Sequence, residues 1–138
     1  MRNGQPEAVI YEGVIVSKPM MIAREVAREL GFLTVTHNYP EHANESLSTE
    51  TDAVITILND YDASAPQIKP EVEAFLEHAR ELEIPVAYIS NHDDIANQLR
   101  LENGDIAVRR GEDVDNVESS MRPWLGDIAA RVLEQSQA

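Results

Sequence analysis

The chain of 138 residues contains no cysteine, which excludes a disulfide framework, a thiolate nucleophile and a thiolate zinc site. Basic residues are also scarce, because 11 Lys and Arg stand against 25 Asp and Glu, for a net charge of −14. Such a surface repels phosphate backbones and anionic headgroups, so we expect no nucleic-acid or membrane partner. No apolar run approaches the ~18 residues of a membrane span, and the apolar run near the N-terminus is too short for a secretory signal. We therefore expect a cytoplasmic protein held together by packing alone.

What the chain does contain is enough apolar material for one core. Its length falls in the usual range of a single domain, and 43% of its residues are hydrophobic. No internal repeat or low-complexity tract divides it. We expect one domain spanning residues 1–138, with a folded core at about 8–134.

Five segments have the composition of strands. The segment 52–58 (DAVITIL) is apolar at nearly every position, which is typical of a central strand covered by helices on both faces. The segment 8–11 (AVIY) ends at a carboxylate, Glu12, followed by a glycine that permits a sharp exit. The other predicted strands are 32–36, 84–89 and 106–108.

Two helices are well marked by their ends. Ser17 precedes the first and Gly31 follows it, with apolar residues every four positions between them. Pro70 suits the first turn of the second, which carries an apolar stripe to Leu82. Weaker patterns predict short helices at 43–47 and up to Leu99.

The last helix contains a proline. Met121, Leu125, Ile128 and Val132 repeat at helical spacing, but Pro123 cannot donate a backbone hydrogen bond. We therefore expect either a kink or a helix start near Ser119 or Ser120.

Strands and helices alternate along the whole chain. This order favours an α/β fold, namely a flavodoxin-like, doubly wound, five-stranded parallel sheet with helices on both faces. In such folds a site forms at the carboxyl ends of the strands, where the strand order reverses. We expect that edge to carry Glu12, residues 58–62, residues 90–94, and Arg109 with Arg110.

From 8 to 134 the segments resemble a response-regulator receiver domain of two-component signalling. "VIYEG" resembles the first strand with its acidic pair, "PMMIAREVARELGF" the first helix and "DAVITILN" the third strand. "IPVAYISNHDD" resembles the fourth strand with its hydroxyl residue, and "DIAVRRGEDVDNV" the fifth strand with its lysine. The resemblance implies the fold and a signalling context.

Matched position by position, the phosphorylation pocket of a receiver is degraded. Glu12 retains one acid of the metal-binding pair, and Ile57 occupies the position of the nucleophilic aspartate. Asn59 supplies the metal-binding carbonyl, Ser90 retains the hydroxyl, and Arg110 replaces the lysine. An isoleucine cannot accept phosphate. We therefore expect a pseudo-receiver, not an enzyme and without a cofactor, which binds a protein partner or itself.

Two catalytic interpretations remain open at this stage. Glu12 with Asp60 and Asp62 resembles a Toprim domain, in which three such carboxylates bind Mg²⁺ for phosphoryl transfer. The same two aspartates followed by Ser64 also resemble a haloacid-dehalogenase phosphatase, although that family needs its nucleophile on the first strand. Solvated loop acids closing a strand-helix turn are the simpler explanation of both aspartates.

Two further residues are candidates for an interaction surface. Arg109 lies at the end of the short fifth strand, where an arginine can bind a carboxylate or phosphate or simply flank the sheet edge. Trp124 is the only tryptophan and lies on the final helix, as a core anchor or an interface residue. The histidines show no metal-ligand spacing.

Overall fold

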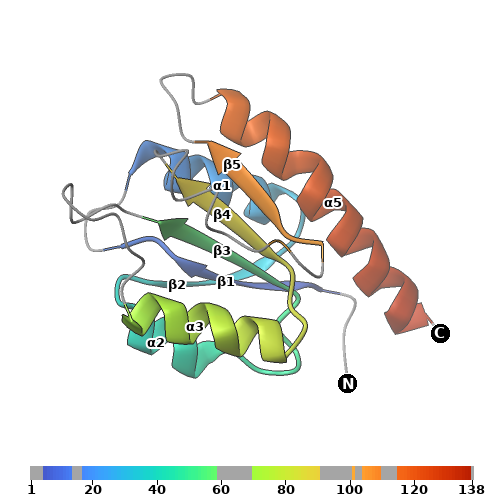
Figure 1. Ribbon diagram of the computed structural model, residues 1–138. Coiled ribbons are helices and arrows are strands. Elements are labelled where there is room, and N and C mark those ends of the chain that lie inside the picture. Colours follow the sequence, from blue (N-terminus) through green and yellow to red (C-terminus); the bar gives the residue numbers. More distant parts are fainter. Residues whose placement is uncertain are drawn as a thin grey trace.

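The computed structural model describes residues 5–13, 17–58, 70–90, 101, 104–109 and 115–137. It contains five parallel strands in the order β2-β1-β3-β4-β5 (Figure 1). This order is that of the flavodoxin-like doubly wound sheet, which confirms the predicted fold class. The strand bounds are β1 Glu7–Tyr11, β2 Leu33–His37, β3 Ala53–Leu58, β4 Val86–Ser90 and β5 Ile106–Arg109.

Helices cover both faces of the sheet. α1 packs against α5 on one face, and α2 packs against α3 on the other (Figure 1). The helix bounds are α1 Lys18–Glu29, α2 Pro40–Ser46, α3 Pro70–Glu81 and α5 Asp115–Gln137. The short helix predicted to end at Leu99 lies outside the described residues.

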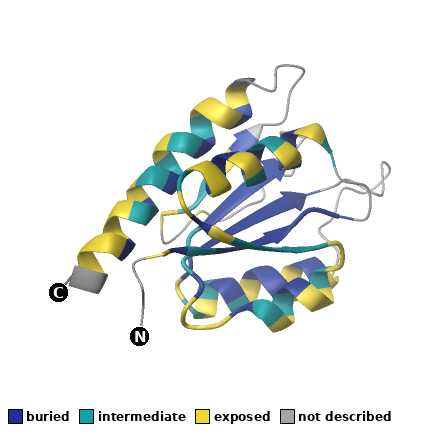
Figure 2. Cartoon of the chain, turned by 180° about the vertical axis from the view of Figure 1, so that it is seen from behind, coloured by how far each residue is buried: buried dark blue, intermediate teal, exposed yellow. Residues whose placement is uncertain are grey.

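The central strand is β3, flanked by β1 and β4. All six of its residues are buried, including Ile55 and Ile57 as predicted (Figure 2). Its register places Ile55 beside Ile10 on one side and Ala87 on the other. A continuous apolar strand is therefore the physical centre of the core.

α1 and α3 end in the same way. After α1, the N–H of Gly31 donates to Arg28 and the N–H of Phe32 donates to Ala27, which is a Schellman motif. Gly31 has a φ of 90°, where glycine is unstrained. Phe32 thus belongs to this cap and not to β2, so the predicted strand 32–36 began one residue too early. After α3, Glu83 and Ile84 make the equivalent bonds to Arg80 and Ala79.

The last helix corrects one expectation. α5 begins at Asp115 and continues through Pro123, so a start near Ser119 or Ser120 is wrong. The reason is burial upstream of the proline: Val117 and Met121 are fully buried and extend the stripe of Leu125. Burying each such side chain stabilises the fold by about 1.5–3 kcal/mol, which together outweighs the roughly 3 kcal/mol cost of an internal proline.

Candidate functional site

The strand order reverses between β1 and β3, so the expected site lies at the carboxyl ends of these two strands. Glu12 and Gly13 follow β1 directly, and Leu58 ends β3. The first acid of the predicted pocket is therefore at the position that the fold favours.

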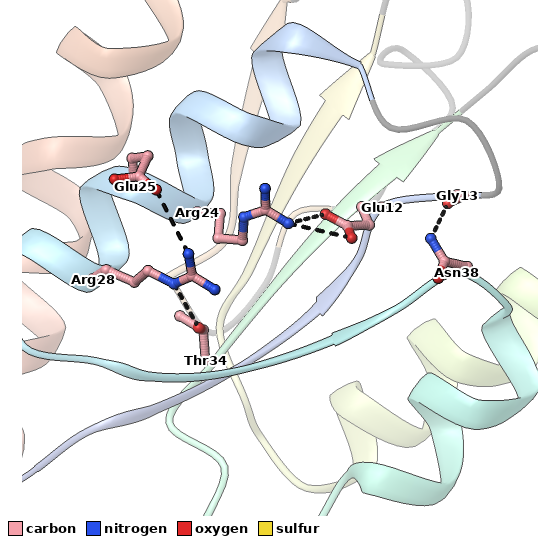
Figure 3. Close-up of polar contacts among 7 residues, drawn as sticks. All are labelled: Glu12, Gly13, Arg24, Glu25, Arg28, Thr34 and Asn38. Carbon is pink, nitrogen blue, oxygen red and sulfur yellow. Dashed lines mark hydrogen bonds and ion pairs between the residues drawn. The ribbon is translucent and has the colours of Figure 1, made fainter.

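Glu12 is buried, with a residue exposure of 5%. Its carboxylate accepts from Nη1 of Arg24, at 3.1 Å to Oε2 and 3.4 Å to Oε1 (Figure 3). Arg24 lies on α1, one layer above the strand that carries Glu12. A buried carboxylate is stable only with such a partner, so both oxygens are committed to a cation of the protein itself.

The backbone after β1 is fixed to the end of β2. The N–H of Glu12 donates to the carbonyl of His37 at 3.0 Å, and Nδ2 of Asn38 donates to the carbonyl of Gly13 at 2.8 Å (Figure 3). Gly13 has a φ of 79°, which other residues adopt only with strain. Gly13 thus has a conformational role in this turn.

Ile57 lies in the core, with 2% exposure, and pairs with Ile89 of β4. The neighbouring Thr56 is fully buried, and its hydroxyl donates to the carbonyl of Ile57 at 3.2 Å. The position matched to the receiver nucleophile therefore carries an apolar group in an apolar environment.

The other predicted pocket residues are only partly described. Ser90 is the last residue of β4, and its backbone pairs with Leu58 and Arg109, but its side chain lies outside the described set. Asn59, Asp60, Asp62, Ser64 and Arg110 lie outside the described residues altogether. Within the described ranges, no group of three His, Asp or Glu side chains is placed to hold a metal ion.

Arg24 was not predicted from the sequence as a site residue. The structure places it beside Glu12, at the carboxyl end of β1. Arg24 directly follows Ala23, which lies on the buried face of α1, so a cation bordering this face was a usable signal. Since Glu12 directly follows β1, an arginine on the next helix was its natural partner.

A second polar cluster lies at the end of β2. A ring nitrogen of His37 hydrogen-bonds the hydroxyl of Ser46, and the His37 and His42 rings lie 6.5 Å apart. Burial lowers the pKa of His37, and the nearby His42 lowers it further, whereas Glu45 acts in the opposite direction. The neutral form of His37 is therefore favoured in the folded chain.

Trp124 is half-buried on α5 and packs against the core. Its indole N–H donates to the carbonyl of Gly104, just before β5, at 2.8 Å. These contacts fit the anchoring role. β5 is an edge strand in which Ala107 is exposed and Val108 is buried; of Arg109 only the backbone is described.

No protein-family model and no curated protein matches the chain. Among solved structures, a de novo designed Rossmann 2x3 fold protein has a TM-score of 0.60 at 15% identity, over 88% of this chain and 90% of the designed one. The sugar isomerase domain of an RpiR transcription factor from Sphaerobacter thermophilus has a TM-score of 0.53 at 13% identity, over 96% and 79%. Aspartate aminotransferase from Thermus thermophilus has 0.50 at 15%, over 96% and 39%.

These similarities establish the α/β fold. The three proteins are described as a designed chain, an isomerase domain and an aminotransferase, and none is described as a receiver. Function resides in sites and not in the fold, so the site residues must carry any functional inference. In the described part of the chain, no helix has the length and apolar character to cross a membrane.

Proposed function

We propose that this chain is a receiver-like interaction module that does not accept a phosphoryl group and acts by binding a protein partner or a second copy of itself. The observation that carries the proposal is the buried Glu12–Arg24 pair. A receiver needs its acids free to bind Mg²⁺, whereas Arg24 already neutralises this carboxylate. The proposal extends the resemblance of the sequence to receivers, whose strand order this sheet shares.

The apolar position 57 supports the same proposal. Phosphorylation of a receiver requires a carboxylate as nucleophile, and Ile57 is buried among aliphatic neighbours. A carboxylate introduced there alone would be a buried charge without a designed partner, which is costly. The packing of Ile57 in β3 therefore supports a chain that does not accept a phosphoryl group.

The competing Toprim-like interpretation requires a free Glu12. Mg²⁺ would have to displace Arg24 and gain Asp60 and Asp62 as further ligands. No observation in the described residues favours that exchange.

The test is a thermal melt with and without Mg²⁺ and beryllofluoride, plus the intact mass after incubation with acetyl phosphate. A ligand at a hundredfold its Kd stabilises the folded state by about 2.7 kcal/mol, which corresponds to a rise in Tm of roughly ten degrees here. We expect no rise and no phosphate adduct. A rise, or an adduct that Asp60→Asn or Asp62→Asn abolishes, would contradict the proposal and place an active site in that loop.

A further inference from the structure

A cavity of about 260 Å³ lies at the amino ends of the strands, opposite to the site described above. It lies between the amino ends of β3 and β4, the turn after α3 and the last turns of α5, whose C-terminal end Figure 1 shows at this side of the sheet. Its apolar lining comprises Leu82, Ile84, Pro85, Ile128 and Val132. None of these residues belongs to the site described above.

One wall of the cavity contains a strained residue. Glu83 has a φ of 57°, the left-handed region that Gly31 occupies in the equivalent cap of α1. A non-glycine residue there costs about 1–2 kcal/mol. This φ is that of the C′ position in the cap that ends α3, and the same turn places the exposed carboxylate of Glu83 at the cavity.

Arg131 of α5 lines the same cavity and is exposed. Arg24, Arg28 and Arg122 each form an ion pair. Among the residues that the structure describes, Arg131 has no such partner, although the chain contains 25 acidic residues. The cavity thus combines a cation without an ion pair, the carboxylates of Glu83 and Asp52, and an aliphatic wall. Its remaining lining is polar and consists of Thr49, Thr51 and Gln135.

We propose that this cavity binds a free α-amino acid with an aliphatic side chain. Arg131 binds the carboxylate, for which the guanidinium fork is suited, and Glu83 binds the ammonium group. The side chain packs on the apolar lining. The volume lies just below the roughly 300 Å³ at which pockets for drug-sized ligands begin, which fits a ligand of this size.

The experiment measures the Tm shift and the calorimetric Kd of the full chain with L-leucine. 4-Methylpentanoate, which lacks the ammonium group, and 3-methylbutylamine, which lacks the carboxylate, are compared at equal concentration. At ten times its Kd, leucine should raise the Tm by roughly five degrees. Both analogues should bind at least about tenfold more weakly, because each lacks one charge contact of about 1.4 kcal/mol or more.

Variants separate binding from folding. Arg131→Gln and Glu83→Gln should weaken leucine binding about tenfold or more, while Arg28→Gln, a remote exposed arginine on α1, should not. Glu83→Gly should also lose binding, yet its Tm without ligand should rise because the strain is removed. A chain that binds neither leucine nor isoleucine, valine or methionine at millimolar concentration, or that binds leucine equally well after Arg131→Gln, would overturn the proposal.

Discussion

Glu12 is the one charged residue that is buried in the described part of the chain, and Arg24 determines what its carboxylate can do. The arginine is about one-fifth exposed, so it meets both water and the buried acid. Removing one partner of such a pair leaves an uncompensated charge, which costs far more than the pair contributes. Glu12 thus has a structural role, whatever its part in the predicted pocket.

Arg24→Met should lower the free energy of unfolding by about 3 kcal/mol, near the lower end for breaking a buried pair. Arg28→Met is the matched control, because Arg28 lies one turn later and is exposed; it should change stability by less than about 0.5 kcal/mol. Adding Glu12→Gln to Arg24→Met should recover part of the loss. Urea unfolding of the variants measures these values, and equal losses for both arginines would contradict the account.

His37 should make stability depend on pH. Its folded pKa is lowered by burial and by His42, so the unfolded chain, with a histidine pKa of about 6.5, binds a proton more readily. The contribution of neutral His37 to the free energy of unfolding is therefore fully present above the pKa of the unfolded chain, and it is lost as the pH falls through the pKa of the folded chain. Between neutral pH and pH 5, the Tm of His37→Gln should fall less than the Tm of the wild type. His42→Gln should have a smaller effect in the same direction. Parallel Tm profiles for the wild type and His37→Gln would contradict this.

At the scale of elements, the sequence predicted the strands and helices that have strong local signals. The continuous apolar run identified β3, and Gly31 marked the end of α1. Phe32 was assigned to a strand because residues 32–36 alternate as strand residues do, whereas the bond from its N–H to the carbonyl of Ala27 places it in the cap of α1. The extent of α5 depends on the burial of Val117, which only the tertiary structure reveals.

The candidate site was less predictable for the same reason. Glu12 was found because it ends an apolar strand, but its partner lies 12 residues away on another element. Likewise, Arg131 and Glu83 meet at one cavity only because α5 returns to the edge where the strands begin. Contacts between residues on different elements cannot be predicted from their spacing along the chain.

Truncation to alanine should lower the free energy of unfolding much more at Ile55 than at Val35. Ile55 is fully buried in the central strand, so Ile55→Ala should cost about 2–5 kcal/mol. Val35 lies half-buried on the edge strand β2, and Val35→Ala should cost about 1 kcal/mol or less. Chemical denaturation measures both. A loss below half a kilocalorie for Ile55→Ala would mean that β3 is not the central strand.

At the scale of the whole molecule, the sheet leaves two edges, β2 and β5. Edge strands offer unpaired backbone groups to another chain unless charge or cover prevents it. β5 is short and lies beside α5, whose Trp124 fixes the segment that enters it. We therefore expect any self-association to use β5 and the last helix.

Sedimentation velocity tests this surface. Ala107→Glu and Arg109→Glu should weaken self-association about tenfold or more, because each places a carboxylate at the contact of two acidic chains. Trp124→Ala should weaken it too, with circular dichroism as a check on folding because Trp124 packs against the core. Leu33→Glu, on the opposite edge, is the control and should have little effect. A dimer indifferent to the changes at Arg109 and Trp124 would place the contact elsewhere.

The most direct test of the central claim is a crystal structure of the full chain determined in excess Mg²⁺. We expect Glu12 still to accept from Arg24, with no ion on its carboxylate, because the buried acid is already neutralised. A hydrated Mg²⁺ held by Glu12, Asp60 and Asp62, with Arg24 displaced, would contradict the pseudo-receiver account and identify this edge of the sheet as a catalytic metal site.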